Sequence, residues 1–232
     1  MTFFSVVGFL ADHNLLMAKT PEYVKRAKIL TTATFYADDT AFVESFRAGD
    51  RSAKAELYRR YAPDIERVLY RVLGWDAEIL ELMQEVFLRA IAGARGFRGG
   101  YPELKPWLTR IAVFTARGWI RKRRLRKWLQ HKPPEEIPDV PAVLASAEEV
   151  ETLKRVYAVI KKMPVKERIP FTLRYMDEMD LVEVADACDV SLATIKRRLQ
   201  KGRQRFISYA KRDPYLNECL SQSDLRRLES VS

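Results

Sequence analysis

Residues 180–205, DLVEVADACDVSLATIKRRLQKGRQR, decide the fold expected for the C-terminal part of this chain. The first half predicts a short amphipathic helix, because Asp180 and Glu183 match a capping box and apolar residues follow at helical spacing. A tight connection comes next, and Ser191 is a favoured N-cap for a second helix. Two short helices joined by a three-residue turn describe a helix-turn-helix. The apolar residues of the first helix are Leu181, Val184, Ala185 and Cys188.

The second helix of this motif carries six basic residues and no acid between residues 191 and 205. Helical spacing places one set of apolar residues on a single face, namely Leu192, Ile195, Leu199 and Phe206. The opposite face holds Thr194, Arg197, Arg198, Lys201 and Arg205. Because the second helix of a helix-turn-helix enters the major groove, this face predicts DNA binding. A basic face that meets only water is the alternative, since many helical hairpins never touch DNA.

The charge of the whole chain points in the same direction. Its 232 residues suffice for one or two domains, and 41 basic against 31 acidic residues give a net charge of +10 and a pI near 9.6. This balance favours nucleic acid or another anionic surface as a partner. Residues 117–132 hold eight basic residues and no acid, whereas residues 133–153 hold six acids and no basic residue.

Several classes of site are excluded by composition. Cys188 and Cys219 form no CxxC pair, so we expect a buried thiol in a reducing cytoplasm rather than a disulfide or a thiolate metal site. His13 and His131 are isolated, which excludes a histidine metal cluster. A Gly-rich phosphate loop and a GxSxG motif are absent. We therefore expect no cofactor and no enzymatic activity.

The N-terminal stretch MTFFSVVGFLADH is apolar, but its run of about ten residues is too short to span a bilayer. It also lacks the basic residues that precede the apolar segment of a signal peptide. A helix packed on the first domain and a start at Met17 are the two alternatives. We expect a cytoplasmic protein without a membrane span.

Low glycine content, the absence of strand alternation and many Ala, Leu, Glu, Arg and Lys residues predict an all-α fold. Four prolines in residues 131–141 favour an extended acidic linker between two helical domains. The predicted helices span residues 21–30, 38–48, 51–73, 76–93, 103–129, 148–162, 166–177, 181–188 and 191–211, with a weak final helix at 216–228. The predicted divisions are an N-terminal extension of unknown role (1–37), a first domain (38–130), a linker (131–147), a second domain (148–212) and a tail (213–232).

Two stretches of the first domain have the character of binding surfaces. The stretch EILELMQEVFLRAI predicts a helix with an apolar stripe, and its opposite face carries Glu81, Gln84, Glu85 and Leu88. A leucine among acids is compatible with a protein partner, although single exposed leucines are common. In the loop GARGFRGGYPELKPW, Phe97 is flanked by arginines. That arrangement suits stacking on an unpaired base, and a loop pinned by one buried phenylalanine is an equal alternative.

The long helix after this loop is expected to carry an arginine stripe. Helical spacing places one set of residues inward, namely Trp107, Leu108, Ile111 and Phe114. It places Arg110, Val113, Arg117, Arg121 and Arg124 on the outward face. Arginines repeated over four turns predict contact with a phosphate backbone.

The order and spacing of these motifs resemble the extracytoplasmic-function (group IV) sigma factors of bacterial RNA polymerase. The resemblance spans about residues 38 to 210 and includes AELYRRYAPDIERVLYRVLG, DAEILELMQEVFLRAI, the FRGG loop, PWLTRIAVFTARGWIRKRR and the stretch from MPVKERIPF to GRQRF. It implies a factor that binds core polymerase with its first domain (sigma domain two) and promoter DNA with both domains, the second being sigma domain four. An anti-sigma protein is a further expected partner of such a factor, though nothing in the sequence identifies one.

The resemblance also assigns residues to each partner. Polymerase binding would use Glu81, Gln84, Glu85 and Leu88. Opening of the minus-ten element would use Phe97, Arg98, Trp107, Arg110, Arg117, Arg121 and Arg124. Reading of the minus-thirty-five element would use Ser191, Thr194, Arg197, Arg198, Lys201 and Arg205.

The chain departs from the family pattern at several positions. The family usually has Asn and Asp where this chain has Phe114 and Gly118, and glycine where Glu178 stands. A polymerase-independent helix-turn-helix regulator is the alternative function, but no added dimerisation or sensor segment is evident. An enzyme acting on nucleic acid is a third reading, and residues for strand chemistry are not in evidence.

Overall fold

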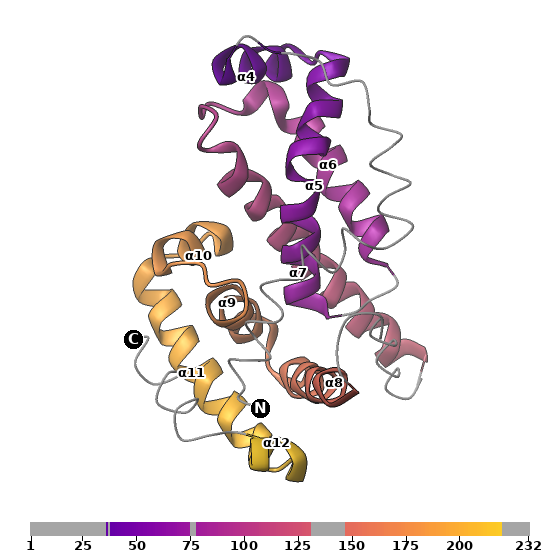
Figure 1. The fold of residues 1–232 in the computed structure, drawn as a ribbon, viewed down its shortest axis with the longest axis vertical. Coiled ribbons are helices and arrows are strands. Elements are labelled where there is room, and N and C mark those ends of the chain that lie inside the picture. Colours follow the sequence, from indigo (N-terminus) through magenta and orange to yellow (C-terminus); the bar gives the residue numbers. More distant parts are fainter. Residues whose placement is uncertain (1–35, 37, 75–77, 131–146, 220–232) are drawn as a thin grey trace.

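The computed structural model of the chain describes residues 36, 38–74, 78–130 and 147–219. Within these ranges every regular element is helical, which confirms the all-α prediction (Figure 1). The helices predicted at 21–30 and 216–228, the N-terminal extension and most of the linker lie wholly or partly outside the described residues. No helix in the described ranges combines the length and apolar character needed to cross a bilayer.

The first domain contains four α-helices and a short 3-10 turn, and their bounds are α4 (Asp39–Ala48), α5 (Arg51–Leu73), α6 (Ile79–Gly93), η1 (Ala94–Gly96) and α7 (Leu104–Gln130). Asp38 and Asp50 cap the first two helices by accepting hydrogen bonds from backbone amides three residues on, at 2.7 and 2.9 Å. Gly49, with φ 83°, supplies the left-handed residue that ends α4. The helices close around a core that includes Phe42, Phe46, Leu57, Ile65, Leu69, Val86, Leu108 and Ala112.

The second domain contains α8 (Ala147–Lys162), α9 (Val165–Tyr175), α10 (Leu181–Cys188), α11 (Leu192–Ala210) and α12 (Pro214–Cys219). Helix α11 lies against α9 at Gly202, where an added Cβ would lie 3.3 Å from the Glu167 carbonyl oxygen. The rings of Phe171 and Phe206 stack at 5.0 Å in the same region. Close backbone approach therefore explains a buried glycine in the interior of a helix, a position where glycine otherwise destabilises.

The two domains pack against each other. Helix α10 contacts α7, and α9 contacts α5 (Figure 1). Arg67 of α5 donates a 2.9 Å hydrogen bond to Asp177, which follows α9. The hydroxyl of Tyr157 in α8 donates to the carbonyl oxygen of Tyr70 at 3.1 Å. These contacts join residues 87 to 110 positions apart in the sequence.

Three predictions about side-chain orientation were wrong. Val113, predicted outward, is fully buried, whereas Phe114, predicted inward, is 41% exposed. Leu192, expected to pack inward, is 40% exposed because it lies in the first turn of α11. Helix α7 is covered on more than one side, by α5, α6 and α10, so a single amphipathic stripe does not describe its burial.

Candidate functional site

The helix-turn-helix forms as its local sequence signals predict. Asp180 accepts hydrogen bonds from the amides of Val182 and Glu183 at 2.8 Å, and Glu183 accepts one from the Asp180 amide at 2.8 Å. Asp189 ends α10 in the left-handed region, with φ 55°, and Ser191 caps α11 by accepting from an amide at 3.3 Å. The capping box and the N-cap are therefore confirmed.

The residues predicted to bind the minus-thirty-five element extend from the N-cap of α11 past its middle, and their exposure differs. Arg197 and Lys201 are exposed, and Ser191 is exposed while it caps the helix. Thr194 and Arg198 are half-buried. Among the basic residues of this set, Arg197, Lys201 and Arg205 are exposed to solvent and Arg198 is half-buried.

Arg205 has a partner inside the protein. Its Nε lies 2.7 Å from Glu167 Oε2, and the Glu167 side chain is only 2% exposed. A buried carboxylate requires such a partner. The structure thus gives Arg205 a role in holding α11 to α9, in addition to the predicted contact with phosphate.

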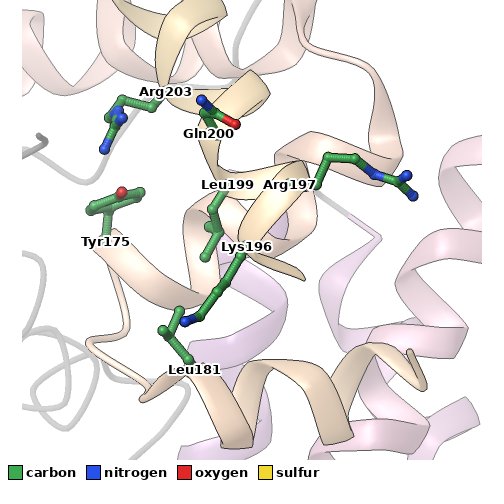
Figure 2. Close-up of a pocket in the computed structure, with 7 residues that line it drawn as sticks. All are labelled: Tyr175, Leu181, Lys196, Arg197, Leu199, Gln200 and Arg203. Carbon is green, nitrogen blue, oxygen red and sulfur yellow. The ribbon is translucent and has the colours of Figure 1, made fainter. Parts of the chain in front are cut away.

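A groove of about 340 Å³ runs beside α11, and its lining includes one of the predicted DNA-facing residues, Arg197. Figure 2 shows Lys196 extending toward Leu181 and Arg203 lying on the side of Tyr175, while Arg197 points the other way. Burial raises the pKa of Tyr175 above its ordinary value. The sequence analysis did not identify Lys196 and Arg203 as residues that line a groove. Their seven-residue spacing places them on the same face of the helix, and that signal could have identified them.

The arginine stripe of α7 is divided by its contacts with α10. Arg110 forms an ion pair with Asp189, and Arg117 donates a 3.3 Å hydrogen bond to the carbonyl oxygen of Cys188. Val113 lies between these two arginines at helical spacing and is buried. Beyond this contact, Arg121 and Arg124 are exposed. Half of the predicted phosphate-binding stripe is therefore engaged by the second domain.

The neighbouring Cys188 is the buried thiol that its helix position predicted. It is fully buried, and burial raises the pKa of its thiol to about 11. It therefore stays protonated at neutral pH, which suits packing rather than metal binding.

The loop after α6 is pinned by its phenylalanine. Phe97 is 5% exposed, and its ring lies 4.9 Å from that of Trp107. Arg47 of α4 donates to the Phe97 carbonyl oxygen at 3.0 Å. Arg98 remains exposed. This geometry favours the second alternative, a loop anchored by a buried phenylalanine, over base stacking. The Phe97 ring packs inside the domain and does not face solvent.

Helix α6 presents the predicted face for a protein partner. Glu81 and Gln84 are exposed, Leu88 is 62% exposed, and Glu85 is half-buried. Glu85 pairs with Arg89 at 2.7 Å along the same helix. The opposite side of α6 is buried, so these four residues form a strip on its outer face, in which Glu85 is half-buried and the other three are exposed.

Comparisons with known proteins match this architecture. Residues 57–126 match the sigma-70 region 2 family and residues 153–206 match the sigma-70 region 4 family, which together cover more than half of the chain. The ECF RNA polymerase sigma factor SigW of Bacillus subtilis (strain 168) is 26% identical over 171 residues, which are 70% of this chain and 91% of that protein. The ECF RNA polymerase sigma-E factor of Escherichia coli (strain K12) is 26% identical over 183 residues, which are 72% and 91% of the two chains.

A solved structure shows the same fold. CnrH, determined in complex with the cytosolic domain of CnrY, superposes with a TM-score of 0.53 at 17% identity and covers 75% of this chain and 98% of its own. The region 2 match falls on α5 to α7, and the region 4 match falls on α8 to α11. With both sigma regions present in the family order, the chain belongs to the extracytoplasmic-function sigma factors.

Proposed function

We propose that this sigma factor binds core RNA polymerase through the exposed face of α6 and promoter DNA through α7 and α11. A sigma factor is an initiation factor that directs RNA polymerase to promoters, and its two regions cover α6, α9 and α10 and most of α5, α7, α8 and α11. The proposed role is binding, not catalysis. No feature of the comparisons favours the polymerase-independent regulator.

One observation carries the DNA-binding half of the proposal. Helix α11 is the second helix of a fully formed helix-turn-helix, and its exposed basic residues Arg197 and Lys201 lie in its second and third turns. The N-terminal part of a recognition helix reaches base edges, whereas its later turns rise toward the backbone. The same helix is therefore expected to combine sequence reading with phosphate contact.

We expect Arg197→Ala to cost about 1–3 kcal/mol at the preferred minus-thirty-five sequence and little on a scrambled duplex. Lys201→Ala changes an exposed basic residue on the same helix and should weaken binding to both duplexes by the same amount. The measurement uses holoenzyme and the duplex it selects from a randomised pool, across a salt series. If Arg197→Ala lowers the affinity for both duplexes equally, α11 contacts only the phosphate backbone and does not read the base sequence.

The polymerase half of the proposal rests on the exposed strip of α6. Glu85→Lys should weaken binding of core polymerase clearly, because it reverses a charge in the centre of that strip. Its effect on stability should stay within about 1 kcal/mol, because it exchanges one i,i+4 ion pair with Arg89 for a like-charge pair. Glu44→Lys, at an exposed acid of α4, makes the same charge change outside the strip. The assignment fails if both variants bind core polymerase with the wild-type affinity.

The packing of the domains constrains how this function proceeds. Arg110 and Arg117 cannot contact phosphate through the groups that now bind Asp189 and Cys188. Full use of the α7 stripe therefore requires α10 to move away from α7. An anti-sigma protein as a partner of this chain is also part of the proposal, and it rests on the family alone.

A further inference from the structure

A second groove lies where the two domains meet, and its lining is cationic. It measures about 420 Å³ and lies between the end of α5, the C-terminal half of α7 and the connection from α8 to α9 (Figure 1). The described residues that line it include no acid and five basic residues, namely Arg123, Arg124, Lys161, Lys162 and Arg168. A concave surface lined by one sign of charge concentrates ligands of the opposite charge. The groove therefore favours an anionic ligand.

The five cations come from three helices and from both domains, two from α7, two from α8 and one from α9. Arg124 and Lys162 are exposed, Arg123 and Lys161 are half-buried, and Arg168 is 6% exposed. Helix α9 begins beside them, and its N-cap Pro164 makes no side-chain capping hydrogen bond, so the positive end of this helix adds to the charge. Cations spread over three helices suit a ligand with several charged groups, such as a chain of phosphates, better than a single carboxylate.

The groove also has an apolar part. Leu73 and Met163 are buried in its wall, and Ile120 and Val165 are half-buried beside them. Sites for small molecules combine an apolar lining with a few polar groups, measure about 300–1,000 Å³ and often lie at domain interfaces. A nucleotide joins a flat base to a chain of phosphates, so it matches both parts of this lining.

We propose that this groove binds a nucleoside polyphosphate, with its phosphates among the five cations and its base packed on Ile120 and Val165. The inference goes beyond the proposed function, since neither polymerase nor DNA takes part in the binding. Because both domains contribute cations, the bound nucleotide favours the packed arrangement in which the second domain engages Arg110 and Arg117. It also occupies Arg124, a predicted contact of minus-ten DNA. A small metabolite thereby limits access to the arginine stripe of α7.

The test measures the fluorescence anisotropy of GTP that carries an N-methylanthraniloyl group, with the full-length chain at physiological salt and without DNA or polymerase. We expect saturable binding from which unlabelled GTP displaces the probe. Guanosine, which lacks phosphates, should compete about a hundredfold more weakly, because hydrogen bonds to charged groups contribute on this scale. Tripolyphosphate, which lacks the base, should compete about tenfold more weakly, because it buries no apolar surface.

Matched variants locate the site. Lys162→Glu in α8 and Arg124→Glu in α7 should each weaken probe binding about tenfold or more, since each reverses a charge at the groove. Lys211→Glu makes the same charge change at the exposed C-cap of α11, outside the groove, and should change the affinity less than about twofold. Val165→Ala should weaken binding of GTP about threefold and leave that of tripolyphosphate unchanged. Thermal unfolding followed by circular dichroism checks that each variant is folded.

Four results would overturn the inference. The first is an absence of saturable probe binding by the wild-type chain. The second is an equal loss in Lys211→Glu and Lys162→Glu, because net charge alone then attracts the probe. The third is equal competition by tripolyphosphate and GTP, since the base then makes no contact. The fourth is probe binding that appears only after Glu135 and Glu136 are replaced by glutamine, which would make the acidic linker the occupant of the groove. Each result leaves the binding of polymerase and promoter DNA untouched, so this inference and the proposed function fail separately.

Discussion

Replacing Asp177 with lysine is expected to separate the two domains. The Asp177 carboxylate, whose side chain is 7% exposed, lies 2.9 Å from Arg67 Nε and 4.0 Å from Arg71 Nε, and the Arg71 side chain is 2% exposed. Burial raises the pKa of Asp177 although Arg67 and Arg71 lie beside it, and burial lowers the pKa of Arg71. Removing one member of a buried pair costs about 3–5 kcal/mol, and a third cation adds repulsion.

The separation can be measured without DNA. The radius of gyration from small-angle scattering should increase in Asp177→Lys, while the helical circular-dichroism signal is retained. Adding Arg67→Glu to this variant places opposite charges side by side again and should restore the compact form. Glu218→Lys makes the same charge change on an exposed residue of α12 and should leave the chain compact. An unchanged radius in Asp177→Lys would show that the ion pair does not hold the domains together.

Separation is also expected to strengthen DNA binding. Movement of α10 away from α7 frees Arg110 and Arg117 from Asp189 and the Cys188 carbonyl. Apparent affinity falls with the fraction of molecules that are competent to bind, so an open variant should bind a 30-base-pair duplex about tenfold more tightly. Glu218→Lys is the control for the positive charge that Asp177→Lys adds. If both variants bind equally while only one is open, the contact between α7 and α10 does not limit DNA binding.

The second large effect is expected from Arg205→Ala. This change leaves the Glu167 carboxylate, 2% exposed, without the guanidinium that lies 2.7 Å away. Arg205 is itself 46% exposed, so water can replace part of what is lost. A loss of about 2 kcal/mol is expected, because an unsatisfied charged group costs more than a neutral one. For a chain of this size that lowers the melting temperature by about 4–8 °C.

Thermal unfolding followed by circular dichroism measures this effect. Lys201→Ala, at an exposed basic position one turn earlier on α11, should change stability by less than about 0.5 kcal/mol. Glu167→Gln together with Arg205→Ala removes the unpaired charge and should recover part of the loss. If Arg205→Ala and Lys201→Ala have the same melting temperature, the ion pair with Glu167 does not stabilise the fold, and contact with phosphate is the one role left for Arg205.

Local signals in the sequence were sufficient to predict the helices and where they begin and end. The capping box of Asp180 and Glu183 and the N-cap at Ser191 act within three residues, and the structure confirms them. The predicted helices from residue 38 to residue 211 match α4 to α11 within a few residues, α6 beginning later than expected at Ile79. Such features depend on hydrogen bonds between near neighbours, so the residue types and their spacing contain the information.

The exposed strip of α6 was also readable from periodicity, because its four members share one helical face and the opposite face is apolar throughout. Periodicity fails where a helix is covered on several sides. In α7 it could not tell that Val113 is buried and Phe114 exposed, because α10, more than sixty residues away in the sequence, covers part of the arginine stripe.

By itself, the sequence determined the helices, their order, the helix-turn-helix and the family to which they belong. The tertiary structure decided which ring faces solvent, Phe97 or Phe114, and which arginines are engaged inside the protein. The reason is physical: helical spacing defines which side chains share a face, but burial and ion pairing depend on which other segment reaches that face. For Arg67 and Asp177, 110 residues apart, only the packing of the two domains supplies that answer.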